Sequence, residues 1–380
     1  MGVYFYPELE VLLDGVSNFT IGITEQCNFR CAYCCYSGQY NYMRHHSAHN
    51  MTEDIRQKTL DFIKRTANTT SQLHISFYGG ETLLEFNNVI WFIEKLEQCF
   101  GKRVTFDIST NGYLLTRKVV DDICSHPGVG ISVSVDGSQE IHNRSRRLAN
   151  GRPTYEQIRA NLMDFKRRYP KEYTKRVRIL VTLASYRDLE TADKNFEELK
   201  SMTGEKNILV SRIVQNYSTN TYLKDSPEET RQFIAHALEY KQKGEVNLHT
   251  LVLDDLMKCS QKKNIFSLSL PTSESKGIRL STCLNHPYSV FITTNGELFP
   301  CEKFGTKGVI GNVETGFDMK AIQQQQASYA IRRSLLCRDC LYIEYCTLCL
   351  KDSRMKFTDQ KKFCSDYIEN IKTAIKLKQK

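Results

Sequence analysis

The sequence predicts an α/β fold, in which a partial barrel of six strand-and-helix units is followed by a small cysteine-rich domain. Six short apolar segments between residues 19 and 215 alternate with segments of helical periodicity. Such alternation is typical of a parallel sheet with right-handed crossovers. Further along the chain, seven cysteines lie within the 82 residues from 283 to 364, around a single hairpin signal.

The composition is that of an ordinary globular protein. The 380 residues are 41% hydrophobic and 25% charged, and this length allows two or three domains with a sizeable core. The N-terminus lacks the basic and apolar regions of a signal peptide, and no apolar run approaches the roughly 20 residues of a membrane helix. The sequence therefore predicts a cytoplasmic protein that has no contact with membranes.

The net charge of +9 has three interpretations. Lysine and arginine can be scattered over a solvated surface, or they can form a surface for nucleic acid or for an acidic peptide. The charge alone does not decide between them.

Each of the six units begins with a strand. These strands are expected at 19–24, 73–77, 104–109, 130–135, 177–183 and 208–214. Thr52 is a capping residue followed by two acids, so it should start the first helix. The other helices are expected at 86–100, 115–124, from 154 onward, and at 188–200.

The units divide the chain into five predicted segments. They are a short N-terminal strand segment (1–18, with a strand pair at 3–13), the partial barrel (19–215), a helical linker (216–282), the cysteine-rich domain (283–364) and a C-terminal helical tail (365–380). The linker should hold helices at 226–243 and 249–263. The cysteine-rich domain should hold short helices and a hairpin, in which Asn295-Gly296 is a type I′ turn signal.

Four polar segments follow strands of the barrel. They are the loop from Cys27 to Cys34, Gly79-Gly80-Glu81, Thr110-Asn111-Gly112 and Asp136-Gly137. Because the carboxyl ends of barrel strands meet at one rim, these segments should share a site. The thiols of Cys27, Cys31 and Cys34 can hold three corners of an iron–sulfur cube, which leaves the fourth iron open to another ligand.

Cysteine pairs also bind zinc, and this alternative stays open on the residues alone. His45, His46 and His49 lie close to the first cysteine loop, and the cysteines beyond 282 could form two zinc sites. A disulfide framework fits poorly, because it needs a secreted context that the N-terminus does not supply.

Together these motifs resemble the radical SAM superfamily. The resemblance implies a [4Fe-4S] cluster on Cys27, Cys31 and Cys34 that binds S-adenosylmethionine (SAM). It implies that Gly79, Gly80 and Glu81 hold the SAM amino group, and that Tyr33 packs near the adenine. The remaining SAM contacts that it implies are Ser109, Asn111, Ser134, Asp136 and Arg146. Thr82 and Asn143 depart from the pattern, where proline and aspartate are usual.

The second cysteine field resembles the SPASM domain of the peptide-modifying branch of that superfamily. The resemblance implies two auxiliary iron–sulfur clusters, and it makes Glu302, directly after one of the cysteines, a candidate catalytic base. One cluster would be fully ligated by Cys337, Cys340, Cys346 and Cys364. The other would have three thiol ligands, Cys283, Cys301 and Cys349.

This resemblance implies a maturase that oxidises, and typically crosslinks, side chains of a ribosomally made precursor peptide. The alternative is an anaerobic sulfatase-maturating enzyme that forms formylglycine, and a different class is a non-catalytic zinc or nucleic-acid-binding protein. The expected partners are the precursor peptide and an electron donor such as flavodoxin or ferredoxin. Only 26 residues precede Cys27, so we also expect a separate protein, the barrel rim or the linker helices to recognise the leader.

Overall fold

The computed structural model describes residues 15–38, 43–183, 186, 189, 196–212, 226–261 and 289–337, with single residues at 361, 364, 365 and 372. Several expectations fall outside these residues: the strand pair at 3–13, nearly all of the tail at 365–380, and four of the cysteines. Those cysteines are Cys283, Cys340, Cys346 and Cys349.

A curved sheet forms the centre of the molecule, and its six barrel strands are those that the sequence predicts. They are β1 (Asn18–Thr24), β2 (Leu73–Gly79), β3 (Val104–Thr110), β4 (Val129–Ser134), β5 (Val177–Leu183) and β6 (Ile208–Arg212). Neighbours in the chain pair in parallel from β1 to β6, so the partial six-unit barrel is confirmed. β1 pairs with β7 (Ser289–Ile292) instead of closing onto β6.

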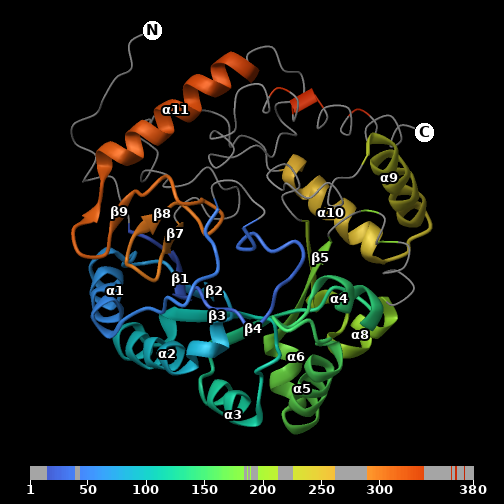
Figure 1. The fold of residues 1–380 in the computed structure, drawn as a ribbon, viewed down its shortest axis with the longest axis horizontal. Coiled ribbons are helices and arrows are strands. Elements are labelled where there is room, and N and C mark those ends of the chain that lie inside the picture. Colours follow the sequence, from blue (N-terminus) through green and yellow to red (C-terminus); the bar gives the residue numbers. More distant parts are fainter. Residues whose placement is uncertain are drawn as a thin grey trace.

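Helices cover the outer side of this sheet, as Figure 1 shows for α1, α2, α3 and α5. The helices of the barrel part are α1 (Glu53–Thr66), α2 (Phe86–Phe100), α3 (Arg117–Ser125), α4 (Gln139–Ser145), α5 (Tyr155–Arg168), α6 (Pro170–Arg176) and α8 (Phe196–Thr203). The sequence did not predict α4 or α6. Both have only seven residues, which is too short for a clear helical period.

The core lies between the sheet and these helices, because alternate strand residues are buried. In β3 and β5 every second side chain is fully buried, which is the pattern of a pleated strand. Phe77 and Phe106 stack across neighbouring strands with ring centroids 6.2 Å apart. This packing fixes the register of the strands, and with it the position of the loops that follow them.

The hairpin of the cysteine-rich region extends the barrel sheet. β7 runs parallel to β1, and β8 (Leu298–Phe299) pairs antiparallel with β7. The hairpin predicted from Asn295-Gly296 is confirmed, but the predicted type I′ turn is wrong. The Gly296 N–H donates to the Thr293 carbonyl, so Thr294 and Asn295 are the central residues and Gly296 follows them with a φ of 79°. This is a three-residue loop with a left-handed glycine.

The remaining helices lie apart from the barrel helices. α9 (Pro227–Gln242) and α10 (Leu248–Gln261) form the expected helix pair of the linker. The cysteine-rich part contains a short ribbon, β9 (Gly311–Asn312) with β10 (Gly316–Phe317), and the 19-residue helix α11 (Met319–Cys337), which is longer than the short helices expected there. The division of the chain into five segments stays a prediction. Among the described residues, no helix combines the length and the apolar character needed to cross a membrane.

The start of α1 offers a local test of the fold. The Thr52 hydroxyl accepts a hydrogen bond from the Ile55 N–H at 3.3 Å, which confirms the predicted cap. We expect Thr52→Ala to lower the free energy of unfolding by about 1 kcal/mol, because one N–H at the helix start loses its acceptor. Urea unfolding checks this, and Thr52→Ser should stay close to the wild type. A loss in Thr52→Ser as large as that in Thr52→Ala would contradict the cap.

Candidate functional site

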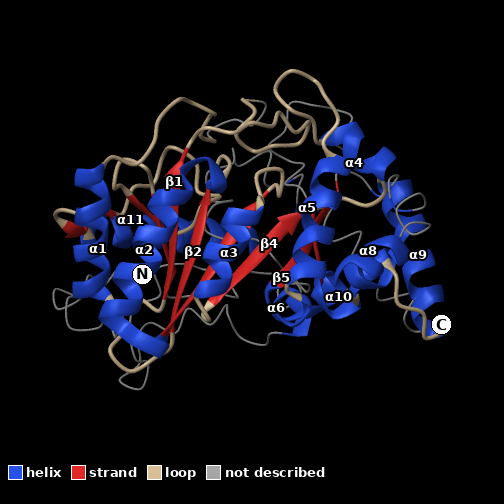
Figure 2. Ribbon diagram, turned by 90° about the horizontal axis from the view of Figure 1, so that it is seen from below, coloured by secondary structure: helices blue, strands red, loops and turns tan. Residues whose placement is uncertain are grey.

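The first cysteine loop leaves the carboxyl end of β1 and lies at the rim where the strands end (Figure 2). Two backbone hydrogen bonds of 2.8 Å anchor it to the end of α4 and the segment that follows. The Ala32 N–H donates to the Ser145 carbonyl, and the Arg30 N–H donates to the Arg147 carbonyl. Cys27, Cys31 and Cys34 are half-buried on this loop. The structure therefore brings together the three thiols that the sequence singled out.

These thiols suit an iron–sulfur cluster. Burial raises the pKa of Cys27 and of Cys31 to about 12, and a hydrogen bond with Cys35 and burial raise that of Cys34. At neutral pH these thiols would stay protonated unless a bound cation such as iron displaced the protons. Among the described residues, no three His, Cys, Asp or Glu side chains converge on one point as a single metal ion requires.

Gly79 and Gly80 pack directly against the cysteine loop. The Gly80 N–H donates to the Thr24 carbonyl at 2.8 Å, and the Glu81 N–H donates to the Gln26 carbonyl at 2.7 Å. A Cβ atom on Gly80 would lie 1.9 Å from the Gln26 carbonyl oxygen, and one on Gly79 would lie 2.2 Å from that of Thr24. The glycines are thus needed for contact between the two loops, which the sequence did not reveal.

Glu81 holds two loops of the rim together. Its buried carboxylate accepts hydrogen bonds from the Leu83 N–H at 3.0 Å, the Thr110 hydroxyl at 2.6 Å and the Asn111 N–H at 2.7 Å. Burial raises its pKa, and the Asn111 N–H opposes that shift. Among the described residues, the Glu81 oxygen that faces Asn111 accepts only this hydrogen bond, so it can accept one from a further donor. Asn111 also reaches the cysteine loop, since its amide donates to the Asn28 side chain at 2.8 Å.

A buried ion pair lies on the other side of the cysteine loop. The Arg146 Nε donates to the Asp136 carboxylate at 2.8 Å, and the Tyr33 hydroxyl donates to the same oxygen. The guanidinium lies 5.3 Å from the centre of the Tyr33 ring. The second Asp136 oxygen accepts from the Thr182 N–H at 3.0 Å. Three predicted SAM-contact residues therefore form one unit. Its arginine lies beside Cys31 and partly offsets the rise that burial causes in the pKa of that thiol.

His142 positions this unit. Its Nδ1 accepts from the Asp136 N–H at 3.4 Å, so Nε2 carries the proton and donates to the Thr154 hydroxyl at 3.1 Å. Burial lowers the pKa of His142 to about 4, so the ring is neutral. Asn143, which stands where aspartate is usual, stabilises the start of α5. Its side-chain oxygen accepts hydrogen bonds from the N–H groups of Thr154 and Tyr155.

Ser109 and Ser134 are half-buried at the carboxyl ends of β3 and β4. They therefore reach the same rim as the other predicted contacts.

The hairpin carries Cys301 and Glu302 to the first cysteine loop. Both are half-buried. Glu302 lies close enough to Cys35 and Tyr36 for its carboxylate to influence the pKa of both side chains. The Arg44 Nη1 donates to the Glu302 carbonyl at 3.0 Å, across 258 positions of sequence. Of the other cysteines in this field, Cys337 ends α11 and Cys364 is described singly.

The sequence placed Asn28 and Thr110 in segments of the site without giving either residue a role. Cys35, Tyr36 and Arg44 were not among the predicted site residues. Of these three, Cys35 and Tyr36 carried a signal, because they follow the third cysteine directly.

Comparison with known proteins supports the same assignment. Residues 21–194 match the model of the Radical SAM superfamily, and residues 283–350 match that of SPASM, an iron–sulfur cluster-binding domain. These matches confirm the predicted order of the two domains, and they confirm SAM and iron–sulfur clusters as the cofactors.

Individual relatives are more distant. A serine-type anaerobic sulfatase-maturating enzyme of Bacteroides thetaiotaomicron is 29% identical over 135 residues, which are 35% of this chain and 32% of that enzyme. The match thus spans about a third of the relative's length. Native anSMEcpe with bound AdoMet has a TM-score of 0.65 at 18% identity, over 95% of this chain and 98% of that chain. SuiB of Streptococcus suis, bound to precursor peptide SuiA, has a TM-score of 0.55 at 16% identity, over 90% and 71%. At these identities the likeness to both structures shows the fold.

Proposed function

Because the chain belongs to the radical SAM superfamily and carries a SPASM domain, we propose that it is a peptide maturase that oxidises, and typically crosslinks, side chains of a ribosomally made precursor peptide. One observation carries this proposal. The hairpin β7–β8 joins the barrel sheet and brings Cys301 and Glu302 to the rim that holds the first cysteine loop. A substrate at this rim would therefore contact both halves of the chain.

The chain's own residues would hold the cofactors. Cys27, Cys31 and Cys34 would bind the first cluster, and the cysteines from 283 to 364 would bind two auxiliary clusters. When bound, SAM and the first cluster would supply radical chemistry for hydrogen-atom abstraction, and the auxiliary clusters would supply electron acceptors. Tyr33, Gly79, Gly80, Glu81, Ser109, Asn111, Ser134, Asp136 and Arg146 would hold SAM, with Glu81 offering its remaining acceptor to the amino group.

Glu302 would accept the proton that the oxidised substrate releases. We expect Glu302→Gln to keep SAM cleavage and to lower product formation by on the order of 10²-fold, the usual contribution of a general base. Mass spectrometry of the peptide, with 5′-deoxyadenosine measured in parallel, checks this. Glu297→Gln is the matched control, because Glu297 is exposed on the same hairpin. Normal product yield in Glu302→Gln would remove this residue from the mechanism.

The second candidate is anaerobic sulfatase maturation, which the higher TM-score of anSMEcpe favours. The test supplies the reconstituted protein with two kinds of substrate, a sulfatase-type peptide with a cysteine or serine and any short peptide that is encoded beside this gene. A product of the second peptide that lacks two hydrogens supports the proposal. Formylglycine in the first peptide, with the second unchanged, would establish the alternative.

The proposal includes two further partners and a compartment. Flavodoxin or ferredoxin would deliver the electron, and a separate protein, the barrel rim or the linker helices would recognise the leader of the precursor. Within the described part of the chain, six cysteines are free thiols, which suits a reducing compartment such as the cytoplasm: Cys27, Cys31, Cys34, Cys35, Cys99 and Cys124.

A further inference from the structure

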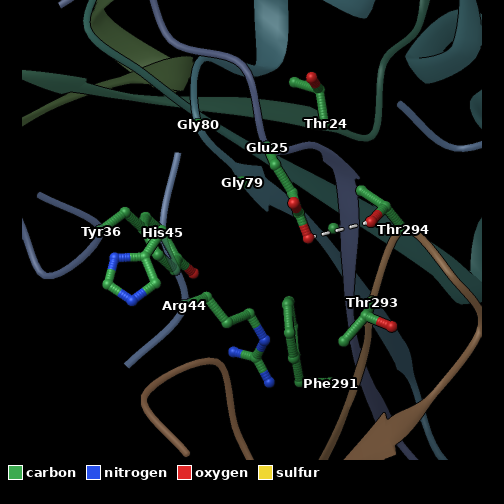
Figure 3. Close-up of a pocket in the computed structure, with 11 residues that line it drawn as sticks. Thr24, Glu25, Tyr36, Arg44, His45, Gly79, Gly80, Phe291, Thr293 and Thr294 are labelled. Carbon is green, nitrogen blue, oxygen red and sulfur yellow. Dashed lines mark hydrogen bonds between the residues drawn. The ribbon is translucent and has the colours of Figure 1, made fainter. Parts of the chain in front are cut away.

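A pocket lies where the first cysteine loop meets the hairpin (Figure 3). The space between its walls is about 300 Å³, and this figure includes open solvent at its mouth. Its walls come from the ends of β1 and β2, from the segment after the cysteine loop, and from β7 with its turn. The lining residues used below are Glu25, Tyr36, Arg44, Phe291 and Thr294.

Arg44 enters this pocket with one end of its guanidinium unpaired. Nη1 donates to the Glu302 carbonyl at 3.0 Å, and the planar group lies 4.7 Å and 4.4 Å from the ring centres of Phe291 and Phe299. These contacts fix the side chain. Nη2 is enclosed, yet it finds no hydrogen-bond partner among the residues that the structure describes. A buried charged donor without an acceptor is costly, so this nitrogen is suited to a ligand.

The acid in the pocket does not neutralise this arginine. The Glu25 carboxylate accepts from the Ser47 hydroxyl at 2.6 Å and from the Thr294 hydroxyl at 3.3 Å. Within the described part of the chain, Arg44 forms no ion pair with it. Figure 3 shows the Glu25 oxygens turned toward Thr294, with Arg44 extending toward Phe291. The Glu25 carboxylate is thus hydrogen-bonded elsewhere, and the Arg44 Nη2 is left for another acceptor.

We propose that Arg44 binds a carboxylate of the peptide substrate in this pocket, close to the residue that is modified. This inference rests on the proposed function. A guanidinium held flat by two rings matches the planar geometry of a carboxylate. Glu302 follows Cys301 at the same point, so a peptide held by Arg44 would lie beside the candidate base. The net charge of +9 also favours the approach of an acidic partner.

The SAM carboxylate is a less suitable ligand for Arg44. Arg146 lies beside Cys31, near the ends of β4 and β5, and can serve that group. Arg44 lies at the opposite end of the rim, against β7 and β8. Gly79 and Gly80 also line the pocket of Arg44, so the experiment below measures SAM binding as well as peptide binding.

Four peptides of one sequence test the proposal. Each has a single central cysteine, with Glu or Gln beside it and with a free or an amidated C-terminus. Fluorescence anisotropy gives their dissociation constants for the reconstituted full-length protein with SAM bound. We expect a peptide that carries the carboxylate bound by Arg44 to bind about tenfold more tightly than the peptide that has Gln and an amidated C-terminus. The four combinations show whether a side chain or the C-terminus supplies it.

Variants assign the effect to Arg44. Arg44→Gln should abolish the preference for the carboxylate, and Arg44→Lys should keep part of it. The matched control is Arg65→Gln, because Arg65 also donates to carbonyls of the cysteine-rich part and lies 5.5 Å from the ring centre of Phe62, but it does not line the pocket. It should keep the full preference.

Three results would overturn the inference. They are equal binding of all four peptides to the wild type, a preference that survives in Arg44→Gln, and weaker SAM binding by Arg44→Gln without peptide. The dissociation constants need no turnover. A carboxylate preference without any oxidised product would therefore contradict the proposed function and leave this inference standing.

Discussion

Gly80→Ala should reduce both iron loading and SAM cleavage to the level of protein that carries no cluster. The new Cβ would lie 1.9 Å from the Gln26 carbonyl oxygen and 2.4 Å from the Gln26 carbonyl carbon. These are backbone atoms of the cysteine loop, so no side chain can rotate to make room. The loop would move away from the end of β2, and the hydrogen bond from the Glu81 N–H to Gln26 would break. Iron content after anaerobic reconstitution and 5′-deoxyadenosine formation measure the effect.

Gly244→Ala is the control for this substitution. Gly244 has a φ of 72°, and its added Cβ would meet nothing within 4 Å. The control thus carries some backbone strain without a clash, and it should load iron as the wild type does. Normal iron loading by Gly80→Ala would show that the contact between the two loops is not required.

Asp136→Asn should lower the free energy of unfolding by about 3–5 kcal/mol, because it leaves the buried Arg146 without its counter-charge. Asp136 is 2% exposed and Arg146 is 7% exposed, so water cannot replace the lost partner. Tyr33 would lose a charged acceptor at the same time. Anaerobic urea unfolding measures the stability, and equilibrium dialysis with labelled SAM should show weaker cofactor binding.

Asp164→Asn is the control for the buried pair. Asp164 pairs with Arg117 and Arg167, both of which are largely exposed, and such pairs contribute little. An equal loss in the free energy of unfolding in Asp136→Asn and Asp164→Asn would contradict the prediction that the buried ion pair contributes more than an exposed one.

The parts of the site that could be predicted are those with local signals. The strands were recognisable because alternate residues face the core, and the cysteine loop because its three thiols lie within eight positions. Their meeting at one rim follows from parallel strand order alone.

The parts that escaped prediction depend on contacts between distant residues. The pairing of β7 with β1 joins segments about 270 positions apart, and nothing in either segment specifies the other. The side chain of Arg44 gives no sign of Phe291, Phe299 or the Glu302 carbonyl. The sequence predicted that Gly79 and Gly80 hold SAM. The structure adds their close contact with the backbone of Thr24 and Gln26, which exists only in the folded chain.

The most direct test of the proposed function uses a precursor peptide that is deuterated at the modified carbon. The reconstituted protein is mixed with SAM, dithionite and this peptide without oxygen, and 5′-deoxyadenosine is analysed by mass spectrometry. We predict that deuterium appears in 5′-deoxyadenosine along with an oxidised peptide, and that replacing Cys27, Cys31 and Cys34 by alanine abolishes both. Iron-loaded protein that oxidises the peptide without transferring deuterium, or that consumes SAM without forming 5′-deoxyadenosine, would contradict the account.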